Sequence, residues 1–521
     1  MTRFWLSATA LCLLISLAIQ PDASAISSSR VLIVYPANGL DSNLDGTNDS
    51  KQLADYYAQK RGIPAANILG VTITVLRNGF YYVGEYSTFY NDLVGPIKSR
   101  LAKLGPANID VILLVGAIPT SVRNAKDEGV TVDNSLMMLS ALDPKTNLIS
   151  MVPNPYFEPT PSFGTDLGHF DHKFKHLGTH DIYMVSRLER MDQVDHALYA
   201  DRFLSPEPGY YNGNMYVDSQ WGQTGNGPNV PPFTDAFLAS QVAVQRGDYY
   251  NAALNADMNI AFSERFVTRS GFPLKWENTT NGLVIGSPGA VFSDGTSATE
   301  APRALFYGGW YNFRNYFDVW RWLPGSVACD LNSASTFGVE ALNHGASAAA
   351  YAWGEPYRTG HQRPHVLIYY LLNGYSFAEA STLSTPTMGW MAINSGDPLY
   401  APTAPKKPIK DTFAPTLGQG YPIIAGGAQR SDRIVHLMIN DTNEPEVVLA
   451  RVDYGTDTNY GSTATSRTGY SKRPTVALTG LKDRTLYHYR VTLEDPVGNV
   501  TVTGDLTFNT SRQPERRPPP L

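Results

Sequence analysis

Short runs of apolar residues recur along most of this chain of 521 residues, and segments with a helical pattern separate many of them. The runs have the length of strands, and they lack the apolar/polar alternation of a strand with one wet face. Strands buried on both faces belong to sheets that helices cover on each side. The predicted strands are residues 31–35, 111–115, 182–186, 304–306, 326–328 and 348–352.

The intervening segments carry the start and stop residues of helices. Ser50 is placed to cap a helix over residues 50–61, and Gly62 and Pro64 end it. Strands and helices in alternation predict an α/β domain over residues 26–401, as one unit or two subdomains, with a mostly parallel sheet flanked by helices. Further helices are predicted at residues 91–104, 195–204, 234–244 and 365–372.

The composition changes at residues 402–414, where Pro and Lys are frequent, as in a linker. Beyond this linker the sequence favours strands alone, separated by turn residues. The spacing predicts a small all-β, immunoglobulin-like sandwich over residues 415–511, with residues 512–521 as a disordered tail. The predicted strands are residues 434–439, 447–453, 474–478, 487–493 and 500–508.

Three motifs of this second unit resemble a fibronectin type III domain: Val452-Asp-Tyr-Gly455, Leu478-Thr-Gly-Leu481 and Thr485-Leu-Tyr487-His-Tyr489. The resemblance implies that Tyr487 is the corner tyrosine, which ties a strand to the preceding turn. Such domains serve as spacers or binders. The resemblance therefore implies a protein or polysaccharide ligand for the sandwich.

Residues 1–25 have the pattern of a secretory signal peptide, with Arg3, an apolar stretch and then Ala23-Ser24-Ala25. Cleavage after Ala25 predicts a secreted or periplasmic protein. No later stretch reaches the roughly 18 apolar residues of a membrane-spanning helix, so no membrane span is expected after cleavage. Of the two cysteines, Cys12 lies in this leader, so Cys329 has no partner for an internal disulfide.

The formal net charge of the chain is −6. Proteins that bind nucleic acids concentrate Lys and Arg to meet the phosphates, so no nucleic-acid partner is expected. A basic cluster, Arg512 to Arg517, falls in the Pro-rich tail and is expected to be part of a disordered end.

Two groups of motifs connect the body of the chain to a family. The first covers residues 49–68, and the second combines Gly308-Gly309-Trp310, Val327-Ala328-Cys329 and Gly396-Asp397-Pro398. Together they resemble a family of uncharacterised secreted bacterial proteins, which is distantly similar to gingipain-type cysteine peptidases of the caspase-like clan. The resemblance implies a caspase/gingipain-like fold for residues 26–401.

In that clan one strand ends in His-Gly and the next in Ala-Cys, and the two side chains act as base and nucleophile. The resemblance gives Cys329 the place of the nucleophile, but it puts Gly309 where the His belongs. A replacement base would have to come from His344, His361 or His365. His344 precedes a predicted strand, so we expect it at the opposite end of the sheet.

Cys329 therefore has two interpretations. It is either a small buried residue at a strand end or a nucleophile with a non-standard base. We expect Gly308 and Gly309 to form a tight turn from the strand into a loop. Two functions follow. The absent His favours a catalytically degenerate, exported protein that acts as a binding or surface-associated component, and the alternative is an active cysteine hydrolase or peptidase that uses Cys329.

One segment resembles the start of an EF-hand calcium loop. Asp41, Asn43 and Asp45 alternate as oxygen ligands would, and Gly46 stands at the sixth position, where the loop turns sharply. The twelfth position holds Gln52 in place of the bidentate Glu. Calcium is thus one prediction for this segment, and an Asx-rich surface turn that leads into a helix is the other.

A cluster of histidines offers a second metal site. His169, His172 and His176, with His180, would share one face of a helix, where two or three of them would suit zinc or another transition metal. Gly178 weakens such a helix. The alternatives are a polar surface loop and a metal-dependent enzyme built on these residues.

Other polar and aromatic residues have structural and functional interpretations side by side. Trp310, Trp320 and Trp322 would suit either a carbohydrate-stacking surface or core packing, and core packing is the more frequent. Arg187 and Asp133 lie near predicted strand ends, where open sheets form ligand crevices. We favour a buried ion pair between them over a pocket.

Overall fold

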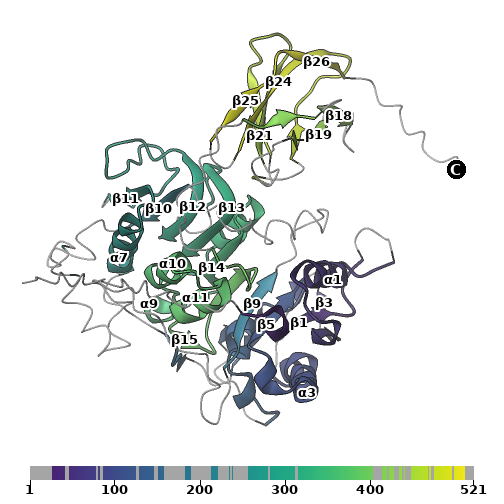
Figure 1. Cartoon of the computed structure of the whole chain (residues 1–521), viewed down its shortest axis with the longest axis vertical. Coiled ribbons are helices and arrows are strands. Elements are labelled where there is room, and N and C mark those ends of the chain that lie inside the picture. Colours follow the sequence, from purple (N-terminus) through teal and green to yellow (C-terminus); the bar gives the residue numbers. More distant parts are fainter. Residues whose placement is uncertain are drawn as a thin grey trace, which may run out of the picture.

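The computed structural model describes residues 26–41, 46–74, 76–77, 80–81, 86–124, 128–145, 151–157, 182–188, 213–220, 234, 238, 256–279, 282–310, 315–402, 414–418, 422–426, 433–436, 439–440, 448–466, 469–470, 474–495 and 498–510. The elements are helices and strands in a large body and strands alone in a smaller unit that follows it (Figure 1). The body is built on one sheet of ten strands, in the order β11-β10-β12-β13-β14-β16-β9-β5-β1-β2. In this order the strands are β11 (Leu274–Glu277), β10 (Asn214–Asp218), β12 (Ala301–Gly309), β13 (Trp320–Asp330), β14 (Ala348–Ala352), β16 (Ala392–Gly396), β9 (Met184–Leu188), β5 (Val111–Val115), β1 (Val31–Pro36) and β2 (Ile68–Val71).

The large sheet consists of two parallel blocks that run in opposite directions. Strands β11, β10, β12, β13 and β14 are mutually parallel. Strand β16 is antiparallel to β14 and parallel to β9, and the parallel pairing continues through β5 and β1 to β2. The carboxyl ends of the two blocks therefore lie at opposite edges of the sheet.

Helices cover the sheet on both faces, which explains why its strands are apolar throughout. Helices α1 and α8 supply buried residues to one face, and α3, α4, α7 and α10 supply them to the other. The helices are α1 (Asp49–Arg61), α2 (Tyr86–Phe89), α3 (Gly95–Leu104), α4 (Val132–Leu136), α7 (Ala256–Arg269), α8 (Phe337–Asn343), α9 (Tyr357–Gly360), α10 (Pro364–Leu372) and α11 (Phe377–Ser384). Short strands also occur at β3 (Leu76–Arg77), β4 (Phe80–Tyr81), β6 (Ser121–Arg123), β7 (Gly129–Thr131), β8 (Val152–Pro153) and β15 (Thr387–Met388).

Helix α1 begins earlier than its sequence predicts. Its N-cap is Asn48, whose side chain accepts a hydrogen bond from the backbone N–H of Lys51, and Ser50 lies inside the helix. The prediction of Ser50 as the cap is therefore wrong, because Asn caps a helix as well as Ser does. The predicted end is confirmed: Gly62 adopts a left-handed φ of 66°, which favours glycine.

Helix α10 is buried on all sides. It packs between the sheet and helices α7 and α11, so its residues are apolar around the whole circumference. Its first residue, Pro364, lies against the backbone of Gly308 in β12, where an added Cβ would come within 2.8 Å of the proline Cβ. Helix α10 therefore fixes the surroundings of the carboxyl ends of β12 and β13.

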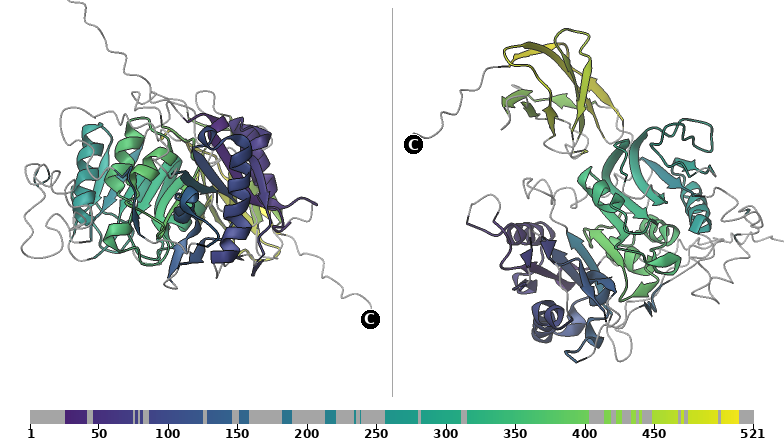
Figure 2. Two further views of the ribbon diagram at one scale, coloured as in Figure 1. Left: turned by 90° about the horizontal axis from the view of Figure 1, so that it is seen from below. Right: turned by 180° about the vertical axis from the view of Figure 1, so that it is seen from behind.

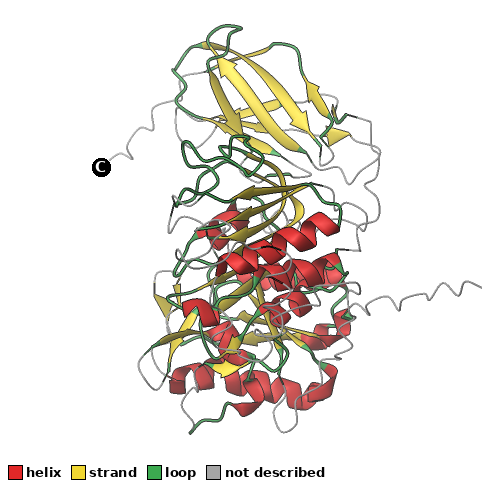
Figure 3. Cartoon of the chain, turned by 90° about the vertical axis from the view of Figure 1, so that its left-hand side faces the viewer, coloured by secondary structure: helices red, strands yellow, loops and turns green. Residues whose placement is uncertain are grey.

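The second unit consists of strands, drawn in yellow in Figure 3, and their pairings are antiparallel. Three sheets form it: β17 with β20; β18, β19 and β23; and β22, β21, β24 and β25, with β26 also paired to β24. Its core is made by alternate residues of β21, β23 and β24. The strands are β17 (Thr416–Leu417), β18 (Ile423–Gly426), β19 (Arg433–His436), β20 (Ile439–Asn440), β21 (Leu449–Gly455), β22 (Ser462–Thr465), β23 (Thr475–Leu478), β24 (Leu486–Glu494), β25 (Val500–Val502) and β26 (Leu506–Asn509).

Tyr487 of β24 makes the contact expected of a corner tyrosine. Its hydroxyl oxygen accepts a hydrogen bond of 2.9 Å from the backbone N–H of Lys482, in the turn before the strand. Its ring stacks on Phe508 of β26, with the centroids 5.5 Å apart. The hydrogen bond ties β24 to the preceding turn, which confirms the role predicted for this residue, and the stacked ring ties β24 to β26.

The all-β unit lies beside the body near β12 and β13 in the views of Figure 1 and Figure 2. Gly469 and Gly498 of the unit approach the body: a Cβ on Gly469 would lie 3.1 Å from the carbonyl oxygen of His344, and a Cβ on Gly498 would lie 2.4 Å from the Arg303 guanidinium. Leu449 and Tyr470 of the unit are buried together with residues of the body.

The predicted fold class is confirmed at its coarse level. A large, mostly parallel sheet with helices is followed by separate antiparallel sheets. Within the part of the chain that the structure describes, none of the helices combines the length and the apolar character needed to cross a bilayer.

Candidate functional site

The carboxyl ends of β11, β10, β12, β13 and β14 meet at one edge of the large sheet. Ligands of open parallel sheets bind at such edges. The sequence predicts that Cys329 and Gly309 lie here, and the structure places both at this edge, in adjacent strands. Three features decide what the edge can do: the face on which the Cys329 sulfur lies, the space at Gly309, and the polar groups at the ends of the strands.

Cys329 lies on the face of the sheet that α10 covers. It is fully buried and packs among apolar residues that include Val327 and Val366. Burial raises the pKa of the Cys329 thiol well above its usual range, and the neighbouring carboxyl of Asp330 raises it further, against a smaller opposite effect of Arg363. The thiol is therefore held in its neutral, weakly nucleophilic form.

Among the histidines that the structure describes, no imidazole is placed to act as a base for Cys329. Among the described residues, no hydrogen bond joins the sulfur to a histidine. The ring of His365 stacks on Phe262, 5.3 Å between centroids. The Nδ1 atom of His361 is buried without a hydrogen-bond partner, and burial, aided by Arg363, lowers the pKa of His361 to about 3.

His344 lies at the other end of the sheet. It follows α8 and precedes β14, and its Nδ1 lies 2.8 Å from the carbonyl oxygen of Glu340. Its ring stacks on Tyr316, 4.5 Å between centroids. The expectation that His344 lies at the opposite edge is confirmed, because β14 runs parallel to β13.

Gly308 and Gly309 end strand β12 and do not form a turn, so the turn predicted for them is wrong. Neither has a left-handed φ, and the need for glycine is one of space. A Cβ on Gly309 would lie 2.6 Å from the backbone oxygen of Asp218 and 2.9 Å from the hydroxyl of Tyr307. The position that a catalytic histidine would occupy therefore has no room for a side chain.

Replacing Gly309 by His should destabilise the protein and should create no hydrolase. The new side chain would meet the backbone of β10, so we expect a loss of about 3 kcal/mol in the free energy of unfolding, measured by urea titration. Gly504→Ala is the control, because a Cβ there meets nothing within 4 Å. A fully stable Gly309→His variant would contradict the packing described here.

A row of carboxyl groups lies on the opposite face of this edge. Glu277, Asp218, Gly309 and Asp330 are register partners across adjacent parallel strands, so their Cα–Cβ directions share one face. Glu277, Asp218 and Asp330 are buried, at 0, 0 and 1% exposure. The missing side chain at Gly309 leaves room for the Tyr307 hydroxyl within this row.

Each of these carboxyls has a local hydrogen-bond donor. The backbone N–H of Ile285 donates to Asp218 Oδ2, the N–H and hydroxyl of Thr279 donate to Glu277 Oε1, and Asn332 donates to Asp330 Oδ1. The remaining oxygens Asp218 Oδ1 and Glu277 Oε2 are buried without a hydrogen-bond donor among the described residues. Two adjacent carboxyls in this situation share a proton.

The pKa values of the pair support a shared proton. Burial raises the pKa of Asp218 well above its usual range, and the charge of Glu277 raises it further. Burial also raises the pKa of Glu277 to about 7, although hydrogen bonds from Thr279 lower it. Within the described residues, no three His, Cys, Asp or Glu side chains are arranged to hold a metal ion. The raised pKa values and the buried oxygens therefore favour a proton shared between Asp218 and Glu277.

The predicted calcium segment is only partly described. Asp41 Oδ2 accepts a hydrogen bond of 2.8 Å from the backbone N–H of Gly46, five residues further along the chain. Asn43 and Asp45 lie outside the described residues, as do His169, His172 and His176. Calcium at the first segment and a transition metal at the second stay predictions.

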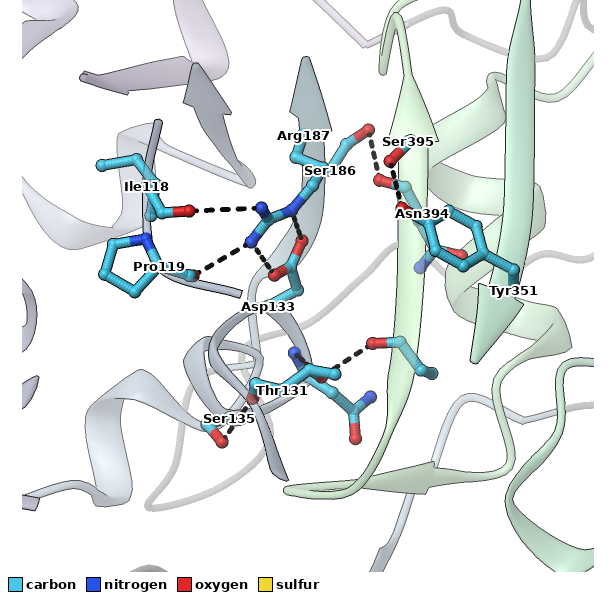
Figure 4. A network of polar contacts seen from close by, with 12 residues as sticks. Ile118, Pro119, Thr131, Asp133, Ser135, Ser186, Arg187, Tyr351, Asn394 and Ser395 are labelled. Atoms are coloured by element: carbon cyan, nitrogen blue, oxygen red, sulfur yellow. Dashed lines mark hydrogen bonds and ion pairs between the residues drawn. The ribbon is translucent and has the colours of Figure 1, made fainter. Parts of the chain in front are cut away.

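Arg187 and Asp133 form the buried ion pair that the sequence favours (Figure 4). Arg187 Nε donates to Asp133 Oδ1 at 2.8 Å, and Nη2 donates to Oδ2. The guanidinium also donates to the carbonyl oxygens of Ile118 and Pro119. These contacts join β9 to α4 and to the loop after β5, so the pair fixes the packing of these elements.

Two segments that carry the family resemblance meet in the structure. The hydroxyl of Tyr57 in α1 donates to Asp397 Oδ1 at 2.5 Å, and Arg61 pairs with Oδ2 of the same carboxyl. Asp397 is fully buried just after β16. The contact anchors α1 to the end of β16 and is structural.

The carboxyl row was not found from the sequence. Its members are the last residues of β10, β11 and β13, and each follows an apolar strand residue: Val217, Trp276 and Cys329. In the sequence, the carboxyl row is indicated only by an acidic residue that directly follows each apolar run. The register of three strands that are distant in sequence was needed to bring the carboxyls together.

No known family model matches the chain, and no characterised protein matches it by sequence. Among the solved structures similar to it is the sixth fibronectin type III domain of human fibronectin type III domain containing protein 3, at 16% identity and a TM-score of 0.14, over 20% of this chain and 88% of that one. A fibronectin type III domain of the human KIAA0970 protein has 20% identity and a TM-score of 0.13, over 20% of this chain and 79% of that one. A purple acid phosphatase from yellow lupin seeds has 16% identity and a TM-score of 0.15, over 25% of this chain and 23% of that one.

Proposed function

We propose that this chain is an exported, gingipain-like protein that has lost cysteine-peptidase chemistry and acts as a binding or surface-associated component. The observation that carries the proposal is the position of the Cys329 sulfur. It is fully buried under α10, on the face opposite the carboxyl row, and has no imidazole bonded to it among the described residues.

Cysteine hydrolysis needs a thiolate, a base within hydrogen-bond reach and access for the scissile carbonyl. The surroundings of Cys329 oppose each requirement. Burial favours the neutral thiol, Gly309 leaves no space for a histidine, and the sulfur is 0% exposed. The alternative function, a hydrolase with a non-standard base, would require access to the sulfur, a thiolate, and a base that reaches the sulfur from a position other than that of Gly309.

Binding is the function that the rest of the chain supports. The all-β unit with its corner tyrosine has the character of a fibronectin type III-like binder or spacer, for which we propose a protein or polysaccharide ligand. The signal-like residues 1–25 support a secreted or periplasmic location. The net charge of −6 argues against a nucleic-acid partner, because such partners are bound through positive side chains.

Alkylation of Cys329 tests the proposal. In the folded protein at pH 7, iodoacetamide should label Cys329 about 100-fold or more slowly than in urea, because labelling requires local opening of a buried thiol. Mass spectrometry of the labelled peptide measures the rate. Cys329→Ala serves as the blank, and it should retain the ligand binding of the unmodified chain.

Rapid labelling of the folded protein would support the hydrolase instead. A rate that follows the titration of a nearby base, together with release of a peptide or ester product that Cys329→Ala abolishes, would establish that alternative. A metal-dependent enzyme on His169, His172 and His176 has a separate test: metal analysis of the purified protein before and after chelation.

A further inference from the structure

A cleft lies where the all-β unit meets the body. Its volume is about 610 Å³, within the range of pockets that hold ligands, and such pockets occur preferentially between domains. Asp318, Trp320 and Arg321 line the cleft from the body, at and just before the start of β13. Residues 463–465 of β22 line it from the all-β unit. A ligand in this cleft would therefore touch both units.

The two walls of the cleft are held by packed residues. Leu449 and Tyr470 of the all-β unit are buried in one cluster with residues of the body, which fixes the contact between the units. On the body side, Trp320 and Trp322 are buried and stack on each other, 4.9 Å between centroids. Their core interpretation is thereby confirmed. Walls that are already in place lower the entropy lost when a ligand binds.

Strand β22 forms the edge of its sheet. In the described sheets it pairs with β21 alone. Its sequence, Ser462-Thr-Ala-Thr465, has none of the charged residues or prolines with which edge strands discourage pairing with another chain. Consecutive residues of a strand direct their side chains to alternate faces, so a cleft lined by all of residues 463–465 runs along this edge and not over one face.

The register shows which peptide groups of β22 face the open edge. In an antiparallel pair, opposite residues alternate between exchanging both backbone hydrogen bonds and exchanging none. The N–H of Ser466 donates to the carbonyl of Ala450 at 2.8 Å, so these two residues are a bonded pair, and Ala464 is likewise directed to β21. Thr463 and Thr465 are the residues between. Their N–H and C=O groups therefore point away from β21, to the open edge.

Such an edge is complementary to an extended peptide. The outward groups of Thr463 and Thr465 repeat after two residues, about 6.7 Å, which is the repeat of another extended chain. From the body side, Arg321 offers further donors, because its contacts with Asp318 and Trp320 in the described part of the chain all use Nη1. Asp318 Oδ1 lies 3.6 Å from that Nη1 and balances its charge, so the cleft suits an uncharged segment.

We propose that an uncharged, extended peptide segment of a partner protein binds in this cleft and adds a strand to the open edge of β22. Main-chain hydrogen bonds to Thr463 and Thr465 supply the affinity, and the wall that the body contributes limits which side chains fit. The inference rests on the proposed binding function. It selects a protein ligand over a polysaccharide and places that ligand between the two units.

Proline substitutions in β22 test the direction of its peptide groups. Proline lacks the N–H and is tolerated in an edge strand where that N–H faces outward. Thr465→Pro should therefore leave the thermal midpoint of the full chain, followed by circular dichroism, within about 2 °C of the parent. Ala464→Pro removes a hydrogen bond to β21 and should lower the midpoint by about 10 °C or more. Equal losses for the two variants would overturn the proposal.

Fluorescence anisotropy of the full chain tests the peptide site. The probes are three uncharged, fluorescein-labelled peptides of eight residues, with Thr-Val, Ser-Ile and Gln-Leu repeats. At least one should bind saturably, and Thr465→Pro should weaken its binding about tenfold through loss of one hydrogen bond. Thr465→Ser keeps the N–H and should bind like the parent. The same peptide with every backbone nitrogen methylated should not bind, because it cannot pair as a strand.

Four results would overturn the proposal: no binding of any of the three peptides, binding that Thr465→Pro leaves unchanged, binding that survives methylation of the peptide backbone, or binding of laminarin, a neutral polysaccharide, in place of the peptides. Slow Cys329 labelling in the same preparation would leave the non-catalytic function standing in each case, so failure of the peptide site and failure of the proposed function are separate outcomes.

Discussion

Replacement of Arg187 by Met should lower the free energy of unfolding by about 3–5 kcal/mol. The side chains of Arg187 and Asp133 are 4% and 3% exposed, so the substitution leaves a carboxylate buried without its cation. The Ile118 and Pro119 carbonyls would lose their donors at the same time. Urea titration followed by circular dichroism measures the change.

A double-variant cycle distinguishes loss of the pair from loss of packing. Asp133→Asn combined with Arg187→Met removes both charges, so the double variant should be more stable than the sum of the single losses predicts. Arg30→Met is the matched control, because Arg30 pairs with Asp110 at the surface, with 37% of its side chain exposed, and should cost about 1 kcal/mol or less. A loss below about 1 kcal/mol for Arg187→Met would contradict the structural role of the pair.

The strands buried on both faces were the most predictable elements. Residues 31–35, 111–115 and 348–352 were predicted, and β1, β5 and β14 occupy them to within one residue. Continuous apolar runs have clear ends because polar residues cannot continue into a covered sheet. Strands β12 and β13 are longer than predicted, since they continue past residues that interrupt the apolar pattern, such as Arg303 and Gly325.

Elements whose limits depend on their partners were predicted less well. Residues 500–508 were predicted as one strand, but β25 and β26 pair with different parts of β24 and are separated by residues 503–505. The helix predicted at residues 91–104 is confirmed, with its end at Leu104, but it begins earlier than predicted: α2 continues through a π-helical segment at Tyr90–Val94 into α3. The helix predicted at residues 195–204 lies outside the described residues.

The candidate site shows where inference from sequence stops. The position of Cys329 at the end of a strand was predicted, but its face was not, because both faces of a covered strand are apolar and alternation is lost. The exposure of Trp353 was missed for a related reason: whether a tryptophan is exposed depends on tertiary contacts that composition does not reveal. The carboxyl row required the register of β10, β11, β12 and β13.

That carboxyl row gives the second large expected effect, a dependence of stability on pH. The folded-state pKa of Glu277 is raised to about 7, above its ordinary value of 4.5. Between these values the folded chain binds more protons than the unfolded chain, so the contribution of Glu277 to stability is full below about pH 4.5 and is lost as the pH rises through about 7. The raised pKa of Asp218 acts with the same sign.

Glu277→Gln should remove most of the loss of stability that occurs as the pH rises. An amide keeps an oxygen for the hydrogen bonds from Thr279 and carries no charge beside Asp218. At pH 8 the variant should exceed the parent in free energy of unfolding by about 2–3 kcal/mol, and at pH 4.5 the two should be nearly equal. Glu300→Gln, which removes an exposed carboxylate from the same body, is the matched control and should shift stability little at either pH.

The sign of the change in the free energy of unfolding that Glu277→Gln causes at pH 8 is the decisive result, because a shared proton and a bound cation predict opposite signs. If a cation held Asp218 and Glu277 as carboxylates, Glu277→Gln would lower the free energy of unfolding at pH 8. The difference between the variant and the parent would grow when metal ion is added. If they share a proton, as their donor-free oxygens indicate, the variant gains stability as the pH rises. Urea titrations at pH 4.5 and pH 8, with and without chelator, therefore decide whether this edge of the sheet holds a proton or a metal ion.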